Sequence, residues 1–220
     1  GKVSRGYLGV NIEELDEDLA ESFGLKSESG ALVTFVEPDS PADQAGIQPG
    51  DVILKINEAE IKAVSDLLLT VSQQTPGTTV QAEIFRDGKR ETYDVVLAER
   101  PDESARSLEG ADPDSSEETE VAGKLFEGIL VQDLTTAARK QLSVPESLNG
   151  ALVTKVSPNS PAAAAGLRRG MIILEIAAGG KSKIIEDAGE AVAHTKTIRA
   201  KTARLYVWDG GAYRYLVLKD

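Results

Sequence analysis

The 220-residue sequence has no cysteine and only one histidine, one methionine and one tryptophan. Without cysteine, neither a disulfide nor a thiolate-ligated metal site can form, and we expect no metal and no cofactor. No apolar stretch approaches the roughly 20 residues that a transmembrane helix requires. Net positive charge is also missing, because 24 basic residues stand against 36 acidic ones, and the resulting formal charge of −12 disfavours nucleic acid as a partner.

Sequence motifs for catalysis are missing as well. The one histidine, His194, lies at the end of a predicted helix of small residues, where an exposed or packed side chain is far more common than a catalytic base. No Gly-x-Ser-x-Gly elbow, zinc-ligand spacing or phosphate-binding loop occurs. The chain itself is therefore not expected to be an enzyme, and no residue is assigned a catalytic role.

Charge is divided unevenly along the chain. Residues 1–100 contain 9 Lys and Arg against 19 Asp and Glu, residues 101–122 contain 1 against 8, and residues 123–220 contain 14 against 9. The middle segment has almost no apolar side chains to offset the entropy lost on ordering it. We therefore predict two domains, 1–100 and 123–220, joined by an acidic linker, 101–122. Roughly 100 residues suffice for each domain to bury its own core.

The most prominent feature that is present is an internal repeat. The run GALVTFVEPDSPADQAGIQPGDVILKI at 30–56 matches GALVTKVSPNSPAAAAGLRRGMIILEI at 150–176 without a gap. In each copy a strand leads to Ser-Pro-Ala, where the hydroxyl of Ser40 or Ser160 can cap a helix that begins at the proline. The glycine six residues after each serine can end this helix in the left-handed conformation, and a buried strand follows.

Three further elements can be predicted from local chemistry. The Asp-Gly pair at 87–88 is a strong signal for a hairpin between strands at 79–85 and 91–97. Residues 65–72 are predicted to form a helix that Ser65 caps. The corresponding helix of the second copy is expected at 186–193.

Together with YLGV at 7–10, the first copy resembles the first PDZ domain of the Do/HtrA serine proteases. The second copy, from FEGI at 126–129 to YRYLVL at 213–218, is similar to the second PDZ domain of that family, although Met171 replaces the acidic Asp51. The resemblance implies a mainly β fold with short helices. The implied architecture is two circularly permuted bacterial-type PDZ domains, each a partly open β-barrel with two helices.

The turn at 7–10 is the predicted binding site for a peptide C-terminus. A short loop with a glycine lets successive amides face one side and bind a carboxylate, and the peptide then adds a strand beside the loop. Its last side chain would enter an apolar pocket. The predicted carboxylate site consists of Leu8, Gly9, Val10 and Arg5, and the groove and pocket of Tyr7, Ile12, Leu67, Leu68 and Val71.

Each assignment has a structural alternative. A glycine between apolar residues is commonly only a turn or bulge. Leu67 and Val71, four residues apart, suit the core-facing side of a helix, which leaves Leu68 as the better groove residue. Arg5 suits an exposed hinge position, and Tyr7 suits a packed ring with an exposed hydroxyl.

The second turn departs from the first. Glu127 stands where the first turn has Leu8, and a like charge there works against binding a C-terminal carboxylate. The small residues of the 186–193 helix leave little from which to build a pocket. We therefore expect the second domain to serve mainly in assembly. Its equivalent, weakened site consists of Phe126, Glu127, Gly128 and Ile129.

The resemblance implies a substrate-recognising, regulatory PDZ tandem of an HtrA-type serine endopeptidase of the periplasm or cell envelope. The expected partners are apolar peptide C-termini or unfolded segments, the protease domain of the same protein, and further copies in a homo-oligomer. The chain is expected to begin in the family's hinge between the protease and the first PDZ domain, with the catalytic triad upstream. The alternative is a free-standing adaptor with two PDZ domains and no protease.

Overall fold

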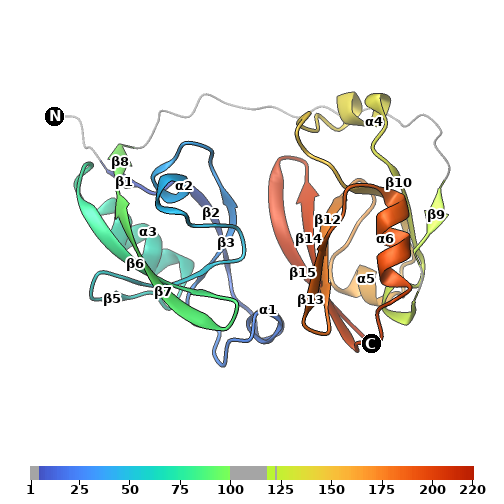
Figure 1. Cartoon of the computed structure of the whole chain (residues 1–220), viewed down its shortest axis with the longest axis horizontal. Helices are drawn as coiled ribbons and strands as arrows, with labels where there is room; N and C mark the ends of the chain where they lie inside the picture. Colours follow the sequence, from blue (N-terminus) through green and yellow to red (C-terminus); the bar gives the residue numbers. More distant parts are fainter. Residues whose placement is uncertain (1–4, 100–117, 122) are drawn as a thin grey trace. The chain divides into compact units, whose positions relative to one another are not determined.

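The computed structural model describes residues 5–99, 118–121 and 123–220, and the chain divides into two compact units, 1–105 and 106–220 (Figure 1). Each unit contains one main antiparallel sheet with short helices packed against it. The predicted fold class, mainly β with short helices, is confirmed. Each unit has a third short helix besides the two that the resemblance implies.

The first unit contains eight strands and three helices among its described residues. In chain order these are β1 (Gly6–Tyr7), β2 (Val10–Glu14), α1 (Glu17–Ser22), β3 (Ala31–Val36), α2 (Pro41–Ala45), β4 (Val52–Ile56), β5 (Ala59–Glu60), α3 (Val64–Ser72), β6 (Thr79–Arg86), β7 (Lys89–Val96) and β8 (Ala98–Glu99). The main sheet has the order β2-β3-β4-β6-β7, with β5 beside β4, while β1 pairs only with β8. Strand β2 is therefore at the end of its sheet.

The second unit repeats the plan of the main sheet and its three α-helices, and it adds a strand and a 3₁₀ helix before the strand that corresponds to β2. Its elements are β9 (Thr119–Glu120), the 3₁₀ helix η1 (Lys124–Phe126), β10 (Ile129–Asp133), α4 (Thr136–Gln141), β11 (Ala151–Val156), α5 (Pro161–Ala164), β12 (Ile172–Ala178), β13 (Lys181–Ile184), α6 (Ala188–Thr195), β14 (Thr202–Asp209) and β15 (Ala212–Lys219). The sheet order is β15-β14-β12-β11-β10-β9, with β13 beside β12. Strand β10, the counterpart of β2, has a neighbour on both edges.

The start of the second unit differs from the predicted linker boundary. Residues 119–121, placed in the linker because of their acidic neighbours, join the second sheet: β9 pairs with β10, and Val121 is only 2% exposed. Strand pairing and apolar burial thus begin before residue 123. The linker residues 101–117 lie outside the described part of the chain.

The repeated helices form for the predicted reason. The hydroxyls of Ser40 and Ser160 each accept a hydrogen bond from the amide three residues on, at 3.3 and 3.2 Å, and a proline stands in the first turn of each helix. Gly46, with φ of 86°, ends α2 in the left-handed region. Local chemistry alone therefore fixes these two helix starts.

The β6–β7 hairpin is confirmed, but the predicted cap of α3 is wrong. Asp87 and Gly88 have φ of 49° and 81°, as a two-residue hairpin turn requires. Helix α3 begins one residue earlier than predicted, and Ser65 does not cap it. The carboxylate of Asp66 instead accepts a hydrogen bond from the amide of Ala63, at 3.1 Å.

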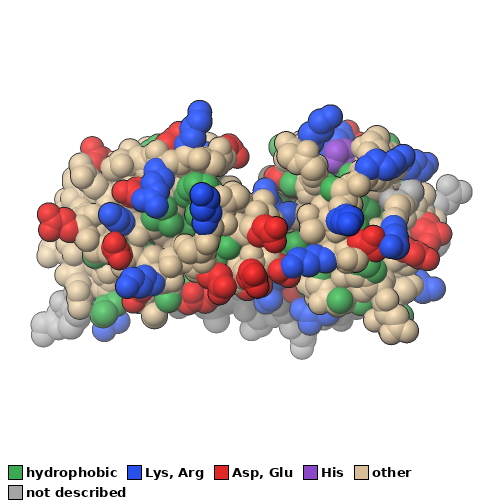
Figure 2. Space-filling model, turned by 90° about the horizontal axis from the view of Figure 1, so that it is seen from below, with side chains coloured by type: hydrophobic (Ala, Val, Ile, Leu, Met, Phe, Trp, Pro, Cys, Tyr) green, Lys and Arg blue, Asp and Glu red, His purple; other side chains and the backbone are tan. Residues whose placement is uncertain are grey.

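Each unit has its own buried core between sheet and helices. On the face seen in Figure 2, acidic and basic side chains are intermixed in both units, with hydrophobic side chains between them. Exposed pairs such as Arg90–Glu83, at 2.9 Å, contribute little to stability because solvent screens them. The cores therefore supply most of the stability. In the first unit the fully buried members include Leu32, Ile53, Ile56, Ile61, Leu67, Ile84 and Leu97, and in the second Phe126, Ile129, Leu167, Met171 and Ile172.

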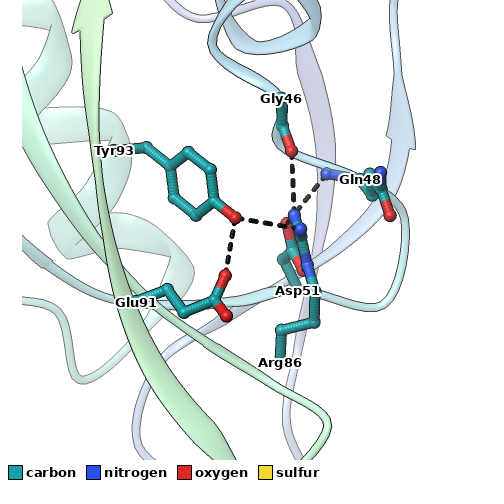
Figure 3. Close-up of polar contacts among 6 residues, drawn as sticks. All are labelled: Gly46, Gln48, Asp51, Arg86, Glu91 and Tyr93. Atoms are coloured by element: carbon teal, nitrogen blue, oxygen red, sulfur yellow. Dashed lines mark hydrogen bonds and ion pairs between the residues drawn. The ribbon is translucent and has the colours of Figure 1, made fainter.

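A buried carboxylate ties several segments of the first unit together (Figure 3). Asp51, only 1% exposed, lies just before β4 and accepts two hydrogen bonds of 2.6 Å from the guanidinium of Arg86 at the end of β6. The same guanidinium donates to the carbonyl of Gly46 at 2.9 Å and to the hydroxyl of Tyr93 at 3.0 Å. The hydrogen bond with Asp51 raises the pKa of Arg86, so the guanidinium stays charged.

The second unit fills the same positions with a different interaction. Met171, 1% exposed, occupies the place of Asp51 in the repeat and packs in the core. Asp209 ends β14 as Arg86 ends β6, and it lies near Arg168, at 3.5 Å, on the surface. The fold can therefore be built with an ion pair or with apolar packing at this point.

We expect Asp51→Ala to lower the free energy of unfolding of the first unit by about 3 kcal/mol, because Arg86 would be left partly buried without its counter-charge. The double variant Asp51→Met with Arg86→Leu replaces the ion pair by apolar side chains and puts methionine where the second unit has Met171, and it should recover most of this loss. Urea unfolding followed by circular dichroism measures both. Emission of Trp208, in the second unit, serves as the internal reference, and a double variant as unstable as Asp51→Ala would contradict the account.

Candidate functional site

The turn between β1 and β2 is held on one side through its carbonyl oxygens. The carbonyl of Leu8 accepts a hydrogen bond from the amide of Ala42 at 2.9 Å, and that of Gly9 accepts one from the amide of Glu37 at 2.8 Å. A trans peptide unit points its N–H opposite to its C=O, and the described chain has no cis bond. The amides of Gly9 and Val10, which share peptide units with these carbonyls, therefore point away from the segment that holds the turn.

Glycine is required at the centre of this turn. Gly9 has φ of 79°, and a Cβ there would lie 2.2 Å from the Cβ of Ser40. The Ser40 hydroxyl also donates to the carbonyl of Gly9, at 3.3 Å. Gly128 repeats the arrangement with φ of 77°, and its added Cβ would lie 2.4 Å from the hydroxyl oxygen of Ser157. Both turns thus depend on close packing against the segment that follows β3 or β11.

Strand β2 presents an edge with no strand paired to it among the described residues, and α3 packs beside both β1 and β2. The start of α3 is tied to the end of β2 by a 2.9 Å hydrogen bond from the amide of Val64 to the carboxylate of Glu14. Beyond α3, the carbonyl of Gln74 accepts a 3.0 Å hydrogen bond from the amide of Gly6 in β1. The turn, the β2 edge and α3 are therefore fixed relative to one another; we name them the β2–α3 site.

The predicted pocket residues divide into core and surface. Leu8, Leu67 and Val71 are 4%, 1% and 7% exposed and belong to one core cluster. Leu67 and Val71 thus face the core, as their spacing of four residues suggests. Ile12 is half-buried and packs against the same cluster. Leu68, in contrast, is 57% exposed on α3. Of the three predicted helix residues, it is the one whose apolar side chain is exposed.

The two polar residues before the turn lie differently. Arg5 is exposed, as the surface alternative predicts. The hydroxyl of Tyr7 donates a hydrogen bond to the carboxylate of Glu37, so it is engaged by the segment after β3. Sequence reasoning missed the groups that hold the turn, which are Glu37, Ser40 and Ala42. Their place in the repeat, directly after the strand, was the signal that could have indicated them.

The second unit has the same turn but a different edge. Phe126 and Ile129 are buried at 1% and 0% exposure, whereas Glu127, aligned with Leu8, is exposed. The carbonyl of Gly128 accepts a 2.8 Å hydrogen bond from the amide of Ser157, as that of Gly9 does from Glu37. Strand β9 pairs with the edge of β10 that corresponds to the open edge of β2, and α6 packs beside both strands. Sequence reasoning did not foresee this strand.

Two other kinds of site find no support in the described residues. Within residues 5–99, 118–121 and 123–220, no group of three or more His, Cys, Asp or Glu side chains is placed to hold a metal ion. No helix in the same ranges is both long enough and apolar enough to cross a membrane.

Comparison with known proteins identifies the kind of domain. The family model of the PDZ domain matches residues 6–97. The "Probable periplasmic serine endoprotease DegP-like" of Pseudomonas putida (strain W619) is 43% identical over 173 residues, which cover 79% of this chain and 35% of that protein. The protein of the same name from Chlamydia trachomatis serovar D (strain ATCC VR-885 / DSM 19411 / UW-3/Cx) is 32% identical over 222 residues, which cover 100% of this chain and 40% of that protein.

The chain thus spans between 35% and 40% of the length of these two relatives. Among solved structures, one of the HtrA-type protease AlgW with a decapeptide is 35% identical and covers 47% of this chain and 32% of that chain, with a TM-score of 0.44.

We expect Gly9→Ala to destabilise the first unit by at least about 3 kcal/mol, because it combines backbone strain of roughly 1–2 kcal/mol with a collision against Ser40. Gly77→Ala is the matched control, since Gly77 has φ of 87° but no atom within 4 Å of an added Cβ. Thermal unfolding of both variants separates the two effects. Equal losses would show that the close approach of Ser40 has no energetic consequence.

Proposed function

Because the chain consists of PDZ domains of the HtrA type, related to those of DegP-like serine endoproteases, we propose that it is the substrate-recognising, regulatory part of such a protease. Its first unit binds apolar peptide C-termini or unfolded segments at the β2–α3 site. The observation that carries this proposal is the direction of the Gly9 and Val10 amides, which point away from the segment that holds the turn and lie where the open edge of β2 begins.

The proposed binding mode adds a strand to the sheet. PDZ domains bind an extended peptide along an exposed sheet edge, where main-chain hydrogen bonds provide affinity and side-chain pockets provide specificity. Here the amides of Leu8, Gly9 and Val10 would bind the terminal carboxylate. The peptide would lie along β2, and its last side chain would contact Ile12 and Leu68. Arg5, exposed before the turn, would add positive potential near the carboxylate.

We assign the second unit a role in assembly rather than in binding C-termini. Two observations support this assignment. Glu127 is exposed beside the turn that would have to bind a carboxylate, and like charges repel. The edge of β10 already has β9 as its neighbour.

The activity of the whole protein is part of the same proposal. The relatives are named periplasmic serine endoproteases, and this chain spans less than half of their length. We propose that the parent protein is a periplasmic serine endopeptidase that forms a homo-oligomer and receives its substrates from the first PDZ unit. A coding sequence without a serine-protease domain before Lys2 would favour a free-standing adaptor instead.

We expect the chain to bind a peptide that ends in a free-carboxylate valine with micromolar affinity, about −8 kcal/mol or weaker. Amidating the peptide should remove most of the binding, because the amides of the turn then lose their anion. Leu68→Asp should weaken binding at least tenfold, since it places a charge beside the peptide's apolar and anionic end. Isothermal titration calorimetry measures these effects.

Leu69→Asp is the matched control for Leu68→Asp. Leu69 is 59% exposed on the same helix, about 100° further around the helix axis and farther from the core-facing side. This variant should bind the peptide as the unchanged chain does. Indifference to amidation, or equal losses in the two variants, would contradict the proposed site.

A further inference from the structure

Strand β9 lies on β10 in the manner of an added peptide strand. It runs antiparallel to β10, with Thr119 opposite Val131 and Glu120 opposite Leu130. The amide of Val121 continues the ladder with a 3.0 Å hydrogen bond to the carbonyl of Ile129, the first residue of β10. In the binding mode proposed for the first unit, a peptide whose carboxylate binds the turn amides would place its last residue opposite Val10, the first residue of β2. Val121 has the corresponding position in the second unit.

The side chain of Val121 is buried as a ligand's terminal side chain would be. It is 2% exposed and shares a core cluster with Ile129 of β10 and with Ala191 and Val192 of α6. Counted from the first helical residue, Ala191 of α6 corresponds to Leu67 of α3. The small residues of α6 thus leave room for an inserted valine, which gives them a function that the sequence did not suggest.

The described chain resumes at Gly123, just before η1. Gly123, with φ of 106°, precedes the first residue of η1. A hollow beside the end of β9 and the start of η1 is lined by Glu120, Val121, Gly123, Lys124 and Glu127. Since an internal segment brings no terminal carboxylate, the exposed Glu127 does not oppose it. The turn that disfavours a free C-terminus is therefore compatible with a continuous chain.

We propose that residues 119–121 are a built-in ligand of the second unit, so that this unit holds a second peptide site that its own chain occupies. The site takes an extended internal segment with a valine in the position of Val121, rather than a free C-terminus. The proposal rests on the strand-addition mode proposed for the first unit. A tethered segment competes at an effective concentration in the millimolar range, which keeps the site closed to weak external peptides.

The test displaces β9 in the full chain. Val121→Asp puts a carboxylate into the apolar pocket and should release the segment. The probe is the acetylated and amidated peptide Glu-Thr-Glu-Val-Ala, and the readout is the amide NMR signals of β10 and α6. We expect the probe to shift these signals in Val121→Asp with an apparent affinity at least tenfold higher than in the unchanged chain. Ile184→Asp, at a residue 70% exposed in the same unit, is the matched control and should behave as the unchanged chain.

Emission of Trp208, which lies in a separate cluster of the second unit, reports whether this unit stays folded. Unshifted β10 and α6 signals in a folded Val121→Asp chain, or equal binding by the unchanged chain, would overturn the proposal. Should Val121→Asp unfold, Val121→Ala takes its place, and the probe must then raise the melting temperature of the second unit. A failure to raise it would also overturn the proposal.

The same spectra keep the two proposals distinct. A free-carboxylate peptide should shift the signals of β2 and α3 in every variant. Loss of those shifts with retained binding at β10 would contradict the proposed function of the first unit alone. Retained shifts at β2 without any response at β10 would contradict only the proposal that residues 119–121 are a built-in ligand.

Discussion

One strand edge beside a short helix is the constraint on which both units depend. The outward N–H and C=O groups of such an edge need a partner, which is water, a peptide or another strand. In each unit a glycine turn fixes where the edge begins, and the segment after the next strand holds that turn through the carbonyl of the glycine. In the first unit the described chain leaves the edge open, whereas in the second β9 pairs with it. The two units share one plan, but only the first leaves this edge free to pair with a peptide strand.

The two units build the same sheet order around this edge with different buried contacts. The first unit joins α2, β4 and β6 through the ion pair of Asp51 and Arg86, and the second reaches the same sheet order with Met171 packed in its core. A buried ion pair offers little net stability over apolar packing of similar size. The repeat therefore preserves helix caps and turns, which fix the backbone, while the buried contacts diverge. The position of the turn relative to the edge is the same in both units.

Features fixed by local chemistry could be predicted from the sequence, and features fixed by distant pairing could not. Ser40, Pro41 and Gly46 specify α2 within seven residues, and Asp87 and Gly88 specify a hairpin. The cap of α3 was assigned to Ser65 because serine is a common cap, but the carboxylate of Asp66 bonds the capping amide. Strand β9 could not be predicted because two residues at the end of an acidic run have no periodic pattern, and only their pairing with β10 makes them a strand.

Hydrogen exchange at the two edge strands tests the central claim most directly. In the chain without peptide, the amide of Val10 should exchange quickly, because it points away from β3 and the described chain offers it no strand partner, and the amide of Val121 should be protected through its bond to Ile129. A saturating free-carboxylate peptide should slow exchange at Gly9 and Val10 and leave Val121 unchanged. Equal protection of Val10 and Val121 before peptide is added, or no change at Gly9 and Val10 at saturation, would contradict the account.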